Sequence, residues 1–222
     1  QIEAQQRSRY RIMQRFRWHI IAYALLAAIA AAYFFFSLSA GLRWWLLFPC
    51  AVALAYVLPL LNGQRLRDFP YIKIFLIALS WAWLTVFGPV WEAGGTIADE
   101  RIILMAIERA AFIFAITIPF DIRDMGLDAA HRLHTLPGVF GVATAKRWAY
   151  ICLLLMGLVA SYLALTGFYQ PWAAAALLVS ALSTAWIVRQ STPDRHDYYF
   201  TGLVDGTMIM QAALLYLMDS LS

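Results

Sequence analysis

Apolar residues occur in long uninterrupted runs along the chain, separated by short segments rich in charged residues. Each run is close to the ~20 residues that a helix needs to cross ~30 Å of hydrocarbon. The runs do not alternate in polarity, as the strands of a transmembrane barrel would. The pattern therefore predicts an all-α fold, a polytopic transmembrane helix bundle with about seven spans. We expect these spans at residues 18–38, 44–61, 72–91, 102–120, 148–166, 172–188 and 199–218.

Composition supports this interpretation. Hydrophobic residues make up 63% of the 222 residues and charged residues 14%, too few charges to coat a water-soluble globule of this size. Soluble enzyme folds are therefore excluded. No loop is long enough for a second folded domain, so we expect residues 1–222 to form a single transmembrane helical domain.

The net charge of +4 comes from basic residues that lie mostly in alternate loops. On one side of the membrane the expected basic residues are Arg7, Arg9, Arg11, Arg15, Arg17, Arg65, Arg67, Lys73, Arg123, Arg132, Lys146, Arg147, Arg189 and Arg195. The other side receives Arg43 and Arg101. Because Lys and Arg are retained in cytoplasmic loops, we expect the N-terminus of this chain in the cytoplasm and the C-terminus outside. Nothing in this distribution indicates binding to nucleic acid.

The connection after the fourth span, residues 119–141, is the candidate site. Asp121, Asp124 and Asp128 are spaced three and four residues apart, so a helical extension of the span would put their carboxylates on one face. Clustered carboxylates need a cation, and their hard oxygen ligands suit Mg²⁺, which typically binds one or two protein carboxylates together with substrate phosphates. A diphosphate bridged by Mg²⁺ is the ligand that this pattern favours.

Basic residues on the same side supply donors that a diphosphate would also need. They are Arg65, Arg67 and Lys73 in the second loop and Arg123 and Arg132 beside the acids. The alternative is that these charges form a solvated surface and serve topology. His131 and His134 are read as surface residues or diphosphate contacts, with a proton-transfer pair or metal ligands as the other possibility.

Three charged residues fall well inside predicted spans, away from their ends, where charges are rare and usually face the bundle interior. They are Glu108, Arg109 and Asp205. We expect them to point inward, either as part of a polar cavity wall or as structural pairs between helices.

Several motifs resemble the UbiA superfamily of intramembrane prenyltransferases. The family's second aspartate-rich motif has the form Asp-x-x-x-Asp followed by Thr-Leu-Pro and Gly, and here it reads Asp124-Met-Gly-Leu-Asp128, with Thr135-Leu136-Pro137 and Gly141 downstream. Asp121 also fits, and Tyr56-Val-Leu-Pro59 with Lys73 resembles the family's tyrosine and lysine region. The ending from Asp197 to Gly206 is similar to a branch of short bacterial members.

This resemblance implies a nine-helix fold of which the chain holds helices three to nine. The family's first aspartate-rich motif, Asn-Asp-x-x-Asp, is absent from this sequence. We therefore expect the sequence to begin partway through a longer protein that carries an upstream helix pair. The bacterial branch implies localisation in the inner membrane.

The resemblance also implies a function and its cofactor. A prenyltransferase would hold Mg²⁺ on Asp124 and Asp128 with Asp121 assisting, bind a polyprenyl diphosphate through Arg65, Arg67, Lys73, Arg123 and Arg132, and pass the isoprenyl group to a lipid, quinone-precursor or tetrapyrrole acceptor. The alternative is a non-catalytic UbiA-like lipid- or pigment-binding or assembly subunit of a larger membrane complex. A transporter or channel is a third interpretation, and it would require broken helices with polar residues at midplane.

Overall fold

A computed structural model describes residues 13–59, 65–66, 69, 71–130 and 133–221. The chain forms two compact units, Gln1–Leu47 and Phe48–Ser222. Across the described residues the secondary structure is helical, with no strand.

The first unit contains helix α2 (Arg17–Ser37) and the start of α3 (Ala40–Val57). Helix α2 is apolar on all sides, and none of its residues is buried by the described part of the chain, as in a helix surrounded by lipid or by other helices. Helix α3 begins four residues before the predicted start at residue 44. The Ser39 hydroxyl accepts a hydrogen bond from the Leu42 amide at 3.2 Å and so caps the first turn.

The second unit begins within α3 and contains the remaining helices. These are α4 (Ile72–Ala82), the π-helical turn η2 (Trp83–Phe87), α5 (Gly88–Glu92), α6 (Glu100–Ala130), α7 (Leu136–Phe140), α8 (Val142–Leu165), α9 (Pro171–Gln190), the π-helical segment η3 (Tyr199–Val204) and α10 (Asp205–Leu221). Across the described residues of both units, seven helical stretches are long and apolar enough to cross a membrane. The predicted all-α bundle with seven spans is confirmed.

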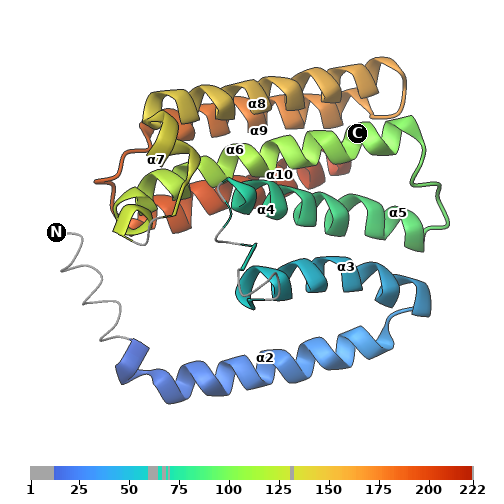
Figure 1. Ribbon diagram of the computed structural model, residues 1–222. Coiled ribbons are helices and arrows are strands. Elements are labelled where there is room, and N and C mark those ends of the chain that lie inside the picture. The colour runs from blue at the N-terminus through green and yellow to red at the C-terminus, as the bar shows by residue number, and fades with distance from the viewer. Residues whose placement is uncertain (1–12, 60–64, 67–68, 70, 131–132, 222) are drawn as a thin grey trace. The chain divides into compact units, whose positions relative to one another are not determined.

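Helix α6 is the central helix of the second unit. It packs against α4 on one side and α8 on the other, while α8 packs against α9 and α9 against α10 (Figure 1). Small side chains such as Ala115, Ala149 and Ala160 are fully buried at these contacts and let the helices approach closely. Large buried side chains such as Phe112 and Met156 fill the space between them.

Helix α6 extends ten residues beyond the predicted end of its span at residue 120. Ile118 and Ile122 are fully buried, so the apolar face of the helix continues past the predicted boundary and packs on the bundle. The helical extension expected for Asp121, Asp124 and Asp128 is therefore present, and most of the predicted loop is helix.

A sharp turn joins α7 to α8. Pro137 lies in the first turn of α7, where its missing amide costs nothing, and Gly141 follows the helix with φ 82° and ψ 156°. This backbone conformation is accessible essentially only to glycine. The segment before α7 lies next to the end of α6 and the start of α4, since the Leu133 amide donates to the Asp128 carbonyl and the Tyr71 amide to the His134 carbonyl.

Candidate functional site

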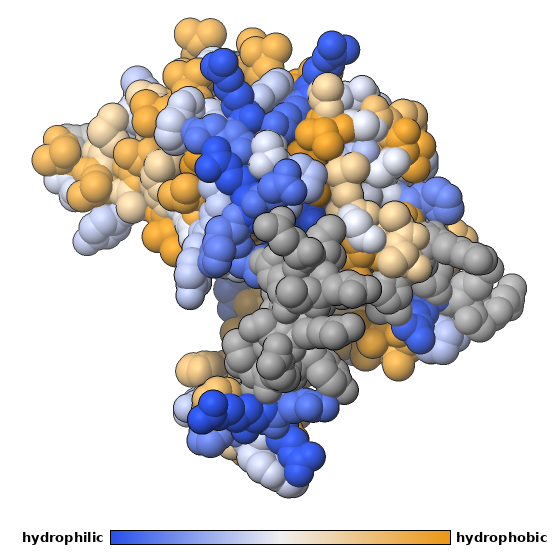
Figure 2. All heavy atoms as spheres, turned by 90° about the vertical axis from the view of Figure 1, so that its left-hand side faces the viewer, coloured by the Kyte–Doolittle hydropathy of each residue, from blue (hydrophilic) through white to orange (hydrophobic). Residues whose placement is uncertain are grey.

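A polar cavity of about 120 Å³ lies where α6 ends and α4 begins. Figure 2 looks onto this end of the bundle, where hydrophilic residues gather. The polar residues that line the cavity come from four separate parts of the second unit: Tyr56, Tyr71, Lys73, Asp121, Asp128, His134 and Thr135. Phe69, Ile74, Leu133 and Leu136 complete the wall.

An ion pair crosses the cavity from α4 to α6. The Lys73 Nζ atom lies 2.8 Å from Asp121 Oδ1, and the exposed fraction of the side chain is 32% for Lys73 but 3% for Asp121. The carboxylate of Asp128 also acts electrostatically on the Lys73 ammonium group. One cation therefore faces two carboxylates in this cavity, and an ammonium group has donors left for a further acceptor.

A strained residue forms the entry to α4. Tyr71 has φ 63°, a left-handed conformation that is unusual for a residue other than glycine. Its amide donates to the carbonyl of His134 at 3.2 Å, and its ring lies 5.7 Å from the ring of Phe140. These contacts hold the segment before α7 against α4 and offset the backbone strain. The sequence contains no signal for this conformation, so Tyr71 was not predicted.

The Thr135 hydroxyl is buried and has no hydrogen-bond partner among the described residues. Thr135 is 7% exposed and lines the cavity. Buried hydroxyls are normally hydrogen-bonded, so this one is suited to a ligand or a water molecule. The motif Thr135-Leu136-Pro137 thus belongs to the wall of the same cavity as Asp121 and Asp128.

Asp124 is held differently from the other two aspartates. Its carboxylate accepts two hydrogen bonds from the neighbouring Arg123, at 2.7 Å from Nε and 2.9 Å from Nη2. Neither residue lines the polar cavity, and nor does Arg65. Sequence analysis also proposed Arg67, Arg132 and His131 for the site, and these lie outside the described residues. The structure thus brings together Lys73, Asp121, Asp128 and His134 from the predicted set.

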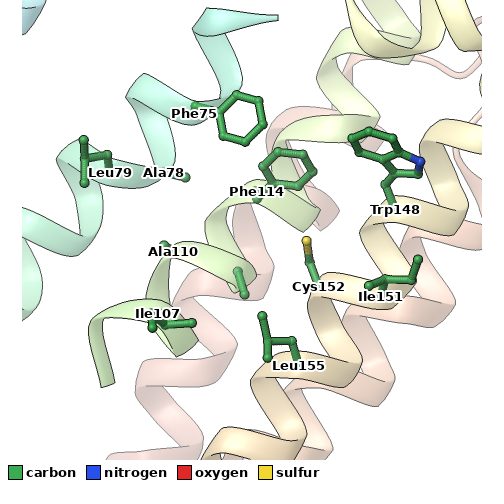
Figure 3. A pocket seen from close by; sticks show the side chains of 11 residues that line it. Phe75, Ala78, Leu79, Ile107, Ala110, Phe114, Trp148, Ile151, Cys152 and Leu155 are labelled. Carbon is green, nitrogen blue, oxygen red and sulfur yellow. The ribbon is translucent and has the colours of Figure 1, made fainter. Parts of the chain in front are cut away.

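An apolar cavity of about 550 Å³ lies between α4, α6 and α8. In Figure 3, Phe75 of α4 faces Phe114 of α6, with ring centroids 5.3 Å apart, and Trp148, Cys152 and Leu155 line the side formed by α8. Positions 107, 114, 121 and 128 of α6 are seven residues apart and so lie on one side of the helix. Ile107 and Phe114 line the apolar cavity, whereas Asp121 and Asp128 line the polar one. The two cavities therefore follow one another along the same face of α6.

A second polar group lies nearer the other end of α6. Glu108 is fully buried and accepts a hydrogen bond from the Tyr169 hydroxyl at 3.2 Å, so the prediction that it points inward is confirmed. Burial raises the pKa of the Tyr169 phenol well above its usual range, and the Glu108 carboxylate raises it further. Arg109 donates to Gln211 of α10, and Gln211 is within 3.4 Å of the Ser180 hydroxyl of α9.

Sequence analysis missed Gln211, although a signal was present. Gln211 is a neutral polar residue inside the last predicted span, and it is 2% exposed. Only the charged residues inside the spans were singled out, so this neutral amide was overlooked. Asp205, also predicted to face inward, is half-buried at the start of α10.

The residues that the structure describes do not complete a metal site by themselves. Among the described residues, no group of three or more His, Cys, Asp or Glu side chains could hold a metal ion. Mg²⁺ requires fewer protein ligands when a bound phosphate supplies the rest. Asp121 and Asp128, facing one cavity beside a lysine, fit this second arrangement.

The model of the UbiA prenyltransferase family matches residues 5–210 of the chain. No curated protein and no solved structure was found to match the chain. The match covers most of each unit and all of the residues that line the two cavities.

Proposed function

Since this chain belongs to the UbiA prenyltransferase family, we propose that it transfers an isoprenyl group from a Mg²⁺-bound polyprenyl diphosphate to a lipophilic acceptor. The family and the seven apolar helices make the protein an integral membrane protein with a lipid-soluble substrate class. The acceptor is a lipid, a quinone precursor or a tetrapyrrole. We further propose the bacterial inner membrane as its location, with the N-terminus of this chain in the cytoplasm and its C-terminus outside.

The observation that carries this proposal is the succession of a polar and an apolar cavity along one face of α6. A polyprenyl diphosphate has a charged head and a long apolar tail, and the two cavities match these parts in order. Lys73, Asp121 and Asp128 would take the head, and the cavity lined by Phe75 and Phe114 would take the tail. Asp121 and Phe114 are two turns apart on α6, so head and tail sites are neighbours.

Mg²⁺ in the polar cavity would be held by Asp121 and Asp128 together with diphosphate oxygens and water. The chemistry that the metal supplies when bound is neutralisation of the diphosphate charge. Lys73 would donate hydrogen bonds to diphosphate oxygens and thus stabilise the leaving group. Arg65 and Arg123 lie in the same stretches of chain as Lys73 and Asp121 and would add positive charge to this end of the bundle, whereas Arg67 and Arg132, also predicted to bind the diphosphate, lie outside the described residues.

The transfer itself breaks the bond between the allylic carbon and the diphosphate oxygen, and the electron pair leaves with diphosphate. The acceptor nucleophile forms the new bond to that carbon and loses a proton. Positive charge on the allylic carbon would be stabilised by aromatic faces, and the apolar cavity offers those of Phe75, Phe114 and Trp148. The apolar wall would also keep water from the carbon.

One observation favours a second candidate, a non-catalytic lipid- or pigment-binding or assembly subunit of a membrane complex. Asp121 already has Lys73 and Asp124 already has Arg123 as a counter-ion, so protein side chains alone compensate these two carboxylates. In that case the apolar cavity would bind a lipid tail and the aspartates would have a structural role.

Calorimetry with geranylgeranyl diphosphate and the detergent-purified protein separates the two candidates. A prenyltransferase should bind the diphosphate in the presence of Mg²⁺, and both EDTA and the double substitution Asp121→Asn, Asp128→Asn should abolish binding. Asp99→Asn is the matched control, because Asp99 pairs with Arg101 at an exposed site away from both cavities. Equal binding by wild type and the double variant, with no effect of EDTA, would favour the non-catalytic subunit.

A further inference from the structure

A second apolar cavity, of about 320 Å³, lies between α8 and α9, which run side by side in the second unit (Figure 1). It shares no lining residue with the polar and apolar cavities described above. Leu154 and Leu158 of α8 and Leu182 of α9 line it and are exposed at the surface of the bundle. The cavity is therefore a groove on the outer surface, where lipid surrounds a transmembrane protein.

Small residues form the floor of this groove. Gly157 lines it, and a methyl group added there would lie 3.1 Å from Leu178 Cδ2, so glycine lets the two helices approach closely. Of the ten lining residues, only Tyr150 and Ser161 carry a polar side-chain group. The Ser161 hydroxyl donates to the Gly157 carbonyl at 2.8 Å, so it is already satisfied. The groove therefore suits an apolar chain rather than a polar group.

The groove leads to basic residues at one end. On α8 the positions 146, 150, 154, 157 and 161 follow one another at helical spacing, so Lys146 lies on the same side of the helix as the lining residues. On α9 the same holds for positions 178, 182, 185 and 189, and Arg189 ends the series. The Lys146 Nζ atom donates to the Arg189 carbonyl at 2.8 Å, so the two basic ends meet.

Lys146, Arg147 and Arg189 form the basic cluster. They are the only charged residues of α8 and α9, two helices that the structure describes in full. Arg147 and Arg189 are exposed, and among the described residues neither guanidinium has an ion-pair partner. The Lys146 ammonium group has two donors left after its bond to the carbonyl. The two helices thus offer three positive charges and no carboxylate at this end of the groove.

Tyr150 connects the groove with the basic cluster. It lines the groove, and the charge of Arg189 acts on its hydroxyl group. Among the described residues that hydroxyl has no hydrogen-bond partner, so it can donate to a ligand. Trp186, one turn before Arg189, is 64% exposed, and exposed tryptophans are typical of the level of lipid headgroups. An apolar groove that ends in cations at this level matches the form of an anionic lipid.

We propose that this groove binds an anionic phospholipid, with an acyl chain between α8 and α9 and the phosphate on the basic cluster. Three cations favour an anionic headgroup over a zwitterionic one, whose own ammonium group they would repel. They also disfavour a second copy of the chain as the occupant, because a copy with the same orientation in the membrane would bring a second basic cluster to the same level. The site does not depend on prenyl transfer, since it shares no residue with the cavities assigned to that substrate.

Native mass spectrometry of the full chain in detergent counts bound lipids, with dioleoylphosphatidylglycerol as the anionic probe and dioleoylphosphatidylcholine as its zwitterionic counterpart. The wild type should bind one phosphatidylglycerol about tenfold more tightly than phosphatidylcholine. The double substitution Arg147→Gln, Arg189→Gln should abolish this preference. Arg15→Gln, Arg17→Gln is the matched control, because it removes two exposed arginines around the start of α2. It should leave the preference within about twofold of wild type.

A further variant tests the apolar part of the groove without changing any charge. Ala185→Leu extends a side chain into the groove, so it should weaken the binding of phosphatidylglycerol about tenfold. A phosphatidylglycerol with a diazirine on its acyl chain should cross-link to Leu154, Leu158 or Leu182 in the wild type. These products should be lost in Ala185→Leu.

Equal loss of the preference in the two arginine variants would mean a general attraction to anionic lipid and would overturn the proposal. So would equal affinity of the wild type for both lipids, cross-links confined to other helices, or an Ala185→Leu protein that binds phosphatidylglycerol like the wild type. A dimer that forms without added lipid and is dispersed by Ala185→Leu would assign the groove to a second copy instead. If the double substitution in the basic cluster unfolds the protein, Ala185→Leu and the cross-links decide alone, since that variant keeps every charge.

Discussion

Lys73 and Asp121 are the residues on which the polar cavity depends. Asp121 is buried at 3% side-chain exposure, and Lys73 is its cation. Removal of one partner from such a pair leaves an uncompensated charge, whereas removal of both can be nearly neutral.

We therefore expect Lys73→Met to destabilise the protein by about 2 kcal/mol, below the ~3–5 kcal/mol of a fully buried pair because Lys73 is partly exposed. The double variant Lys73→Met, Asp121→Leu should recover most of the loss. Thermal unfolding in detergent, followed by circular dichroism, measures both. The double variant should still fail to bind pyrophosphate, which separates stability from ligand recognition. A single variant as stable as wild type would show that Asp121 has another adequate partner.

Sequence analysis identified the residue types of the site but not which partner each aspartate has. Asp121, Asp124 and Asp128 look alike in the sequence, at one helical spacing. Their difference arises from partners far along the chain: Lys73 lies 48 positions before Asp121, and Phe200, whose ring packs on the arginine that pairs with Asp124, is contributed by η3. Side-chain partners at such separations depend on helix packing, which hydropathy does not specify.

At the scale of helices, span positions were predicted well because length and apolarity alone determine them. Helix ends and irregular turns were not. The π-helical segments η2 and η3 lie inside predicted spans, and no residue pattern distinguishes them from α-helix. The end of α6 was placed too early because the charged residues after 120 resemble a loop, although Ile122 keeps the helix on the core.

The turn from α7 to α8 depends on Gly141. Its φ of 82° and ψ of 156° are strained for any side chain, so Gly141→Ala should destabilise the protein by about 1–3 kcal/mol. Gly206→Ala is the matched control: Gly206 is helical, with open space around an added methyl group, and the change should be neutral or slightly stabilising. Thermal unfolding midpoints of the two variants should therefore move in different directions. Equal midpoints would mean that the turn adapts without strain.

The contact between α6, α9 and α10 depends on Gln211. Its amide oxygen accepts from Arg109, and its amide nitrogen is near Ser180. Gln211→Leu fits the space but leaves Arg109 without this acceptor, so we expect a loss of about 1.5–3 kcal/mol, as for other hydrogen bonds to charged groups. Gln190→Leu, at the half-buried end of α9, is the control and should change little. If the Gln211→Leu variant unfolds at the same temperature as wild type, water replaces the amide as the acceptor for Arg109.

At the scale of the molecule, the architecture follows from the family and the hydropathy pattern, but the cavities do not. Ile107, Phe114, Asp121 and Asp128 can be placed on one side of α6 from their spacing alone. That Ile107 and Phe114 border an apolar cavity while the aspartates border a polar one depends on where α4 and α8 approach α6. A change from apolar to polar residues along one helix stripe could have been recognised earlier as the mark of an amphipathic ligand.

Cys152 offers a direct test of this arrangement, because it lines the apolar cavity while Cys50 does not. If the cavity holds the isoprenyl tail, geranylgeranyl diphosphate with Mg²⁺ should slow the reaction of Cys152 with N-ethylmaleimide several-fold. Inorganic pyrophosphate, which lacks the tail, should have little effect. Cys50, exposed on α3, is an internal control within the same molecule and should react at the same rate with and without either ligand. Mass spectrometry of the digested protein gives the rate at each cysteine. Equal protection of both cysteines would indicate a general change in the protein, and protection of neither would mean that the tail lies elsewhere.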